Sequence, residues 1–243
     1  MIASQRSHDR FATKRWSVVM QHAAARDASA QGAMSELARR YWYPVYAYLR
    51  HSGHAPAVAE GMSRAFLGTL LQEIGNGSQP PRGHFRRYLL EQLNVFLRRD
   101  WREIVGAPIA SELAAPADLE LRYGEDRTGA TSPEQAYQRS FAQEVIARAL
   151  RRLQAEASRA GHGAMFAALE MHLARDPGPG EHAALAQQLD LRPLGVAVAL
   201  RRLRERFREM VGEELADTVV SADDLAAEQA ELHAILSEPR GTQ

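Results

Sequence analysis

The chain has 243 residues, of which 45% are hydrophobic and 25% are charged. This length allows one or two domains with a full core, and the composition excludes a mostly disordered chain, a collagen-like repeat and a coiled-coil rod. Because the chain has no cysteine, disulfides, cysteine-ligated metals and thiol catalysis are also excluded. No apolar run is long enough to span a bilayer and the N-terminus lacks a secretory signal, so we expect a cytoplasmic protein.

The formal net charge of 0 hides an uneven distribution. Residues 1–105 carry a net charge of +7, residues 106–140 carry −3, residues 141–211 carry +3, and residues 212–243 carry −7. All basic residues except Lys14 are arginines, which suit phosphate and guanine but are also what a GC-rich genome encodes by default. The pattern fits either an uneven solvated surface or two nucleic-acid-facing modules with an acidic linker and tail.

The hydrophobic pattern has a helical period nearly everywhere and no sustained two-residue alternation, which predicts an all-α protein. Two capping patterns stand out, at Ser132–Gln135 and at Ser221–Asp224, and Pro44 is expected to kink the helix that contains it. The helices are expected at about 13–20, 33–50, 56–70, 85–104, 133–160, 162–173, 182–189, 193–211 and 221–236. Because residues 106–132 are rich in glycine, proline and polar residues, we interpret them as a linker.

Residues 182–211 have the pattern of a helix-turn-helix. A short helix is followed by a tight turn at Asp190, which tolerates left-handed geometry, and a long helix begins at Pro193 with Val196 and Leu200 on its inner face. Five arginines follow within eight residues: Arg201, Arg202, Arg204, Arg206 and Arg208. They indicate a phosphate-binding face, although an ordinary helical hairpin with a solvated basic face would have the same pattern.

Four further segments carry a resemblance to a known family. They are FATKRWSVV (11–19), YWYPVYAYLR (41–50), GHFRRYLL (83–90) and LNVFLRRDWRE (93–103). In collinear order with the helix-turn-helix, they resemble bacterial RNA polymerase sigma factors of the extracytoplasmic-function type, in the branch whose genes often neighbour Ser/Thr protein kinases.

The resemblance implies two helical domains and two partners, core RNA polymerase and promoter DNA. Residues 10–105 would form a sigma domain 2-like unit that binds polymerase and opens the −10 element, and 106–132 the linker. Residues 133–220 would form a sigma domain 4-like unit that reads the −35 element, and 221–243 an acidic tail. The expected DNA-contacting residues are Arg98, Arg99, Trp101, Arg102, Arg192, Arg201, Arg202, Arg204 and Arg208.

The polymerase-binding stretch of the family has a counterpart in Val58–Arg64, where only Glu60 remains of its acids. We expect Glu60, Ser63 and Arg64 to contact polymerase. Ser63, placed on an exposed helical face, is a candidate phosphorylation site for a Ser/Thr kinase, since a phosphate would restore negative charge there. The alternative is a degenerate sigma-like regulator that acts by protein–protein contact without directing initiation.

The sequence gives no reason to expect catalysis or a bound cofactor. It contains neither a nucleotide-binding glycine loop nor a His-Glu-x-x-His pattern, and its nine histidines are spaced unfavourably for a metal site. We therefore expect no enzymatic activity, no cofactor and no metal.

Overall fold

The structure is a computed structural model that describes residues 28–75, 84–99, 115, 117–126, 129–178, 180–216, 218–219 and 221–237. Across these ranges the chain is helical and contains no strand, which confirms the all-α prediction. None of the helices described is both long and apolar enough to cross a membrane. The helix expected at 13–20 and the end of the one expected at 85–104 lie outside the described residues.

The chain divides into two compact units. Unit 1 combines Met1–Glu144 with Leu215–Gln243, and unit 2 is Val145–Glu214. These ranges differ from the predicted 10–105 and 133–220, because the start of the predicted second domain and the acidic C-terminal helix belong to unit 1. Two long helices, α8 and α11, therefore begin in one unit and end in the other.

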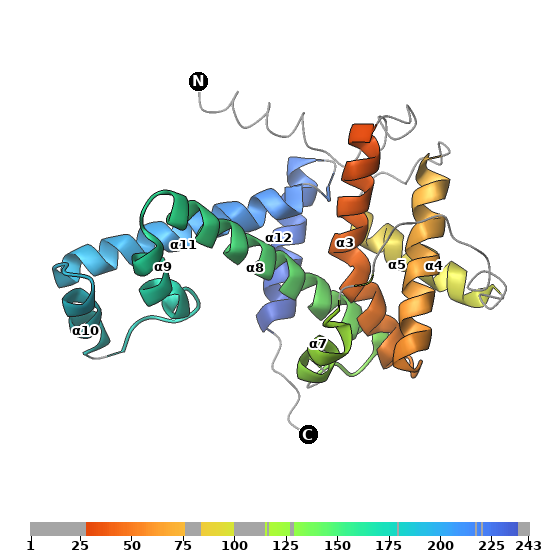
Figure 1. Ribbon diagram of the computed structural model, residues 1–243, viewed down its shortest axis with the longest axis horizontal. Coiled ribbons are helices and arrows are strands. Elements are labelled where there is room, and N and C mark those ends of the chain that lie inside the picture. The colour runs from red at the N-terminus through yellow and green to blue at the C-terminus, as the bar shows by residue number, and fades with distance from the viewer. Residues whose placement is uncertain are drawn as a thin grey trace. The chain divides into compact units, whose positions relative to one another are not determined.

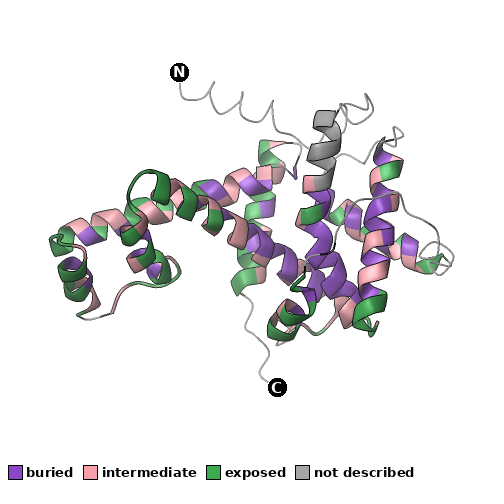
Figure 2. Cartoon of the chain, in the orientation of Figure 1, coloured by how far each residue is buried: buried purple, intermediate pink, exposed green. Residues whose placement is uncertain are grey.

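Unit 1 is built around α3 (Ala28–His51), α4 (Pro56–Gly75) and α5 (Phe85–Arg98), with α3 packed against α4 (Figure 1). Pro56 opens α4, where its missing N–H has no cost. Buried side chains continue almost all the way round the later part of α3 (Figure 2). In the core of unit 1, the ring of Tyr41 stacks on the ring of Phe141 with centroids 5.5 Å apart. It also meets the ring of Phe85 edge-on, with centroids 5.2 Å apart.

Among its described residues, unit 1 also contains α7 (Leu119–Asp126), the first part of α8 (Pro133–Arg159) and α12 (Ala222–Ser237). Both predicted caps are confirmed. The Gln135 N–H donates to Ser132 Oγ at 3.1 Å, and Ser221 Oγ accepts from the Asp224 N–H at 3.1 Å. These caps set the starts of α8 and α12.

The interpretation of 106–132 as linker is wrong for 119–126, which form α7. The helix forms because Leu119 and Tyr123, four residues apart, are both buried, while its acidic side chains bind residues of α3. Tyr43 Oη donates to Asp126 at 2.5 Å, and Tyr46 Oη donates to Glu120 at 2.6 Å.

Unit 2 contains the rest of α8, α9 (Gly163–Leu169), a 3-10 turn η1 (Glu170–His172), α10 (Glu181–Gln188) and most of α11 (Pro193–Ala216). The chain turns between α8 and α9 at Gly161, whose φ is 78°. One apolar cluster joins α9, α10 and the start of α11, and another joins α8, α9 and the later part of α11. Unit 2 is thus a small helical core with α11 along one side.

Candidate nucleic-acid interface

The helix-turn-helix predicted for 182–211 is present in unit 2 as α10 and α11. Asp190, in the turn, has a φ of 51°, the left-handed geometry that aspartate tolerates better than most residues. The Leu191 N–H donates to the Ala186 carbonyl at 2.9 Å and closes the turn. Val196 and Leu200 are 0% and 3% exposed, so the inner face of α11 is the one that the spacing predicted.

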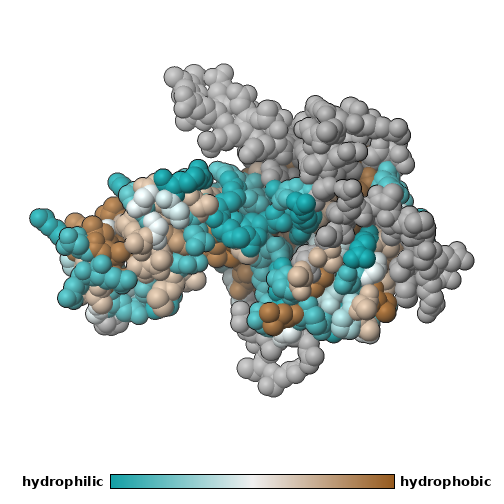
Figure 3. All heavy atoms as spheres, viewed as in Figure 1, coloured by the Kyte–Doolittle hydropathy of each residue, from teal (hydrophilic) through white to brown (hydrophobic). Residues whose placement is uncertain are grey.

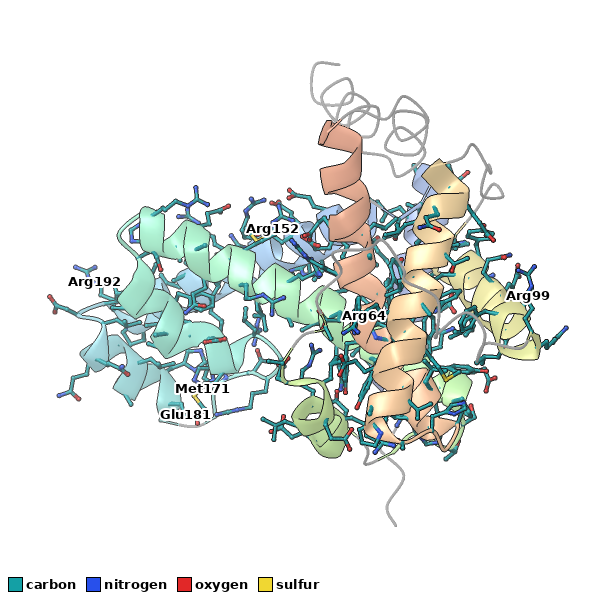
Figure 4. The ribbon with its side chains drawn as sticks, turned by 45° about the vertical axis from the view of Figure 1, so that its right-hand side comes forward. Arg64, Arg99, Arg152, Met171, Glu181 and Arg192 are labelled. Carbon is teal, nitrogen blue, oxygen red and sulfur yellow. The ribbon has the colours of Figure 1, made fainter. Side chains whose placement is uncertain are left out.

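Four of the predicted DNA-contacting arginines in unit 2 face solvent. Arg192, Arg202 and Arg208 are exposed, and their side chains make no hydrogen bond or ion pair with another described residue. Arg192 projects from the end of unit 2 (Figure 4). The side chain of Arg201 is 72% exposed. It lies 3.8 Å from Glu205, one helical turn away, and water screens this surface ion pair. These four guanidinium groups can reach phosphates.

Arg204 departs from the prediction, because it binds the protein itself. Its guanidinium donates to the carbonyl of His172 at 2.6 Å and to that of Arg175 at 2.7 Å, and it pairs with Asp176 at 2.7 Å. The His172 carbonyl is at the end of η1 and the Arg175 carbonyl is in the bend after it. No continuing helix supplies N–H donors to these carbonyls. Arg204 is therefore a positioning residue that ties this segment to α11.

Two other arginines of unit 2 are held in ion pairs. Arg206 donates to both carboxylate oxygens of Glu156, at 2.9 and 2.7 Å. The hydrogen bond from Arg206 lowers the pKa of Glu156 below its usual value. Arg152 pairs in the same way with Glu213 and Glu214, at 2.5 and 2.7 Å. They tie α8 to α11, so part of the arginine-rich sequence is structural.

In unit 1 the predicted melting segment is described only in part. Arg98 and Arg99 are exposed at the end of α5 (Figure 4). Trp101 and Arg102 lie outside the described residues. Phe96 is 5% exposed and packs on Phe66, so it belongs to the core.

The prediction that Ser63 lies on an exposed face is wrong. Its side chain is 0% exposed, and its hydroxyl donates to the Ala59 carbonyl at 2.8 Å. Most positions of α4 are alanine, glycine or larger apolar residues, so more than one side of the helix is buried. The spacing of the apolar residues alone predicted a single buried side. In the folded unit this hydroxyl is covered, so the phosphorylation predicted at Ser63 would need local opening of α4.

Glu60 and Arg64, the other predicted polymerase contacts, pair with each other at 2.7 Å along α4. Each side chain is 41% exposed. The pair presents one dipole to solvent where the family's motif presents several acids, so this surface of α4 carries no net charge from these two residues.

The sequence reasoning missed an ionic cluster between α5 and α12. Arg86 is 1% exposed, its Nε donates to Glu228 at 2.7 Å, and its Nη2 lies 2.8 Å from Glu231. His84 Nδ1 lies 2.8 Å from Glu228, and Arg87 pairs with Glu231 at 2.9 Å. Burial lowers the pKa of Arg86, but the bonds and charges of the two glutamates outweigh it and raise the pKa overall. The sequence signal for this cluster is the opposite net charge of two segments: residues 212–243 are acidic and residues 1–105 are basic.

Among the residues described, no three histidine or acidic side chains lie close enough to hold a metal ion. Comparison with protein-family models, with curated proteins and with solved structures finds no match for this chain.

Proposed function

We propose that this chain is a sigma-type transcription initiation factor, which binds core RNA polymerase in the cytoplasm and directs it to promoter DNA. The observation that carries the proposal is the helix-turn-helix of α10 and α11, flanked by the exposed arginines Arg192, Arg202 and Arg208. In such motifs the second helix lies in the major groove while cations bind the phosphates on either side.

Unit 1 supports the same proposal through the end of α5. Arg98 and Arg99 are exposed there, within the segment of residues 93–103 that resembles the family's promoter-melting region. Exposed arginine beside aromatic residues is the composition that holds single-stranded nucleic acid. In this proposal unit 2 binds duplex DNA and the end of α5 holds the opened strand.

Run-off transcription tests the proposal directly. The full chain is mixed with purified core RNA polymerase of its own organism on genomic fragments, and chain-dependent transcripts are expected. Replacing both Arg202 and Arg208 by alanine should reduce the transcripts. The matched control replaces Arg151 and Arg159, exposed arginines on α8 in the same unit, and should leave transcription unchanged.

The second candidate function is a sigma-like regulator that acts by protein contact alone. The pairing of Glu60 with Arg64 favours it, because this stretch then offers polymerase little negative charge. The same assay separates the two functions. A chain that binds core polymerase or another protein but yields no transcript on any fragment would favour the regulator.

A further inference from the structure

The outward face of the first two turns of α11 is apolar. Leu194 is 76% exposed, Ala197 is exposed, and Val198 is half-buried. With Arg201 they are spaced at i, i+3, i+4 and i+7, so they lie on one face of the helix. We call Leu194, Ala197 and Val198 the apolar stripe. It is distinct from the buried face that Val196 and Leu200 form.

The surroundings of the apolar stripe are basic. Arg192 precedes it, and Arg201 and Arg202 follow it. Figure 3 shows hydrophobic residues gathered at the end of unit 2 where α10 meets α11, with hydrophilic residues around them. An apolar surface inside a rim of arginines complements the base edges and flanking phosphates of a DNA groove.

The side chains of the stripe restrict which bases it can distinguish. From Pro193 to Leu200 the sequence is PLGVAVAL, in which no side chain can donate or accept a hydrogen bond. In the major groove, bidentate contacts to adenine need asparagine or glutamine, and cytosine needs a carboxylate. The base feature that an apolar side chain contacts is the C5 methyl group of thymine.

We propose that Leu194 and Ala197 read thymine methyl groups in the major groove of promoter DNA. The inference rests on the proposed function, since it places the N-terminal turns of α11 against base edges. It adds a specificity: the −35-type site of this chain contains thymine at the positions under the stripe. Arg192 and Arg201, which flank the stripe, contact phosphate or guanine beside them.

The experiment compares thymine with uracil, which lacks only the methyl group. Duplexes are selected from a random pool by the full chain, alone and in complex with core polymerase. Each thymine of the selected duplex is then replaced by deoxyuridine and binding is measured. At the contacted thymine the affinity of the wild type should fall about fourfold, the value of burying one methyl-sized group.

Two variants make the result specific to the stripe. Leu194→Ala should bind the thymine and uracil duplexes with nearly equal affinity at that position. Met171→Ala is the matched control, because Met171 is 64% exposed in the same unit but lies on η1. It should retain the fourfold difference. Both sites are exposed, so both variants are expected to fold.

Three outcomes would overturn the inference. Selected duplexes whose thymines can all be replaced without loss would show that the stripe reads no methyl group. A shift in oligomeric state on Leu194→Ala would assign the stripe to a protein contact. Absence of selective duplex binding in either form would remove this inference together with the DNA-binding part of the proposed function.

The inference and the proposed function fail separately in the remaining cases. Chain-dependent transcription without a thymine–uracil difference would leave the initiation factor standing and reject the readout. A difference that depends on Leu194, found without any transcription, would keep the readout and reject the initiation role.

Discussion

Arg86 of unit 1 and two arginines of unit 2 lie in opposite environments. In unit 1 Arg86 is 1% exposed and held between Glu228 and Glu231 of the acidic C-terminal helix. In unit 2 Arg202 and Arg208 are exposed, and their side chains make no hydrogen bond or ion pair with another described residue. A basic block in the sequence therefore does not by itself mark a charged surface, because carboxylates of the same fold can neutralise it.

The largest effect is expected where the buried arginine loses its partner. Glu228→Gln leaves the Arg86 guanidinium buried with Glu231 as its remaining counter-charge. Breaking a buried pair in this way should lower the free energy of unfolding by about 3 kcal/mol. Urea denaturation of the full chain measures it.

The matched control for this variant is Glu91→Gln, an exposed glutamate on α5. It should change the free energy of unfolding by less than about 0.5 kcal/mol. Equal losses for the two variants would show that the Arg86–Glu228 pair contributes nothing beyond an ordinary surface charge.

Arg204 is the intermediate case, since it lies among the exposed arginines of α11 but bonds to the fold. Arg204→Ala removes donors from the carbonyls of His172 and Arg175 and should cost about 2 kcal/mol of unfolding free energy. The salt dependence of DNA binding should be unchanged. Arg201→Ala, at a site 72% exposed, is the stability control and should cost almost nothing. A salt slope that falls with Arg204→Ala would return this residue to the DNA-binding face.

The exposed arginines should show the reverse pattern. Replacing Arg202 and Arg208 by alanine should leave the free energy of unfolding within about 0.5 kcal/mol. The slope of log affinity against log salt should fall by about two units, roughly one per lost phosphate contact. Fluorescence anisotropy over a salt series measures it, with the Arg151→Ala and Arg159→Ala pair as the charge-matched control. An unchanged slope would mean that these arginines do not contact DNA.

Local signals in the sequence predicted local structure well. The caps at Ser132 and Ser221, the turn at Asp190 and the inner face of α11 all follow from spacing and side-chain chemistry within a few residues. The helix-turn-helix could be located for the same reason, because its two helices are consecutive and its turn is short.

Features that depend on distant partners could not be predicted. Arg204 and Arg208 look alike in the sequence, and what distinguishes them is a bend around residues 172–176 that happens to present free carbonyls. Spacing within α4 predicts an exposed Ser63, because the pattern of one helix does not show which other helices cover it. The pairing of Arg86 with Glu228 joins residues 142 positions apart, so nothing in the pattern around either one reveals the other.

The smallest effect is expected at the start of α10, where a surface ion pair lowers the pKa of one carboxyl group, that of Glu181. Arg175 donates to both oxygens of Glu181, at 2.8 and 3.0 Å, and the Gly178 N–H donates to it at 2.5 Å. These hydrogen bonds lower the pKa of Glu181 from 4.5 to about 2, and the bond from Arg175 has the largest effect. Because the pKa is lower in the folded chain, the contribution to stability is complete above pH 4.5 and is lost as the pH falls toward 2. An NMR titration of the Glu181 carboxyl should therefore have its midpoint near 2, and Arg175→Ala should raise it toward 4.5, while Arg151→Ala should not move it. A wild-type midpoint near 4.5 would mean that water screens the pair, and the start of the helix-turn-helix would then depend on its apolar contacts alone.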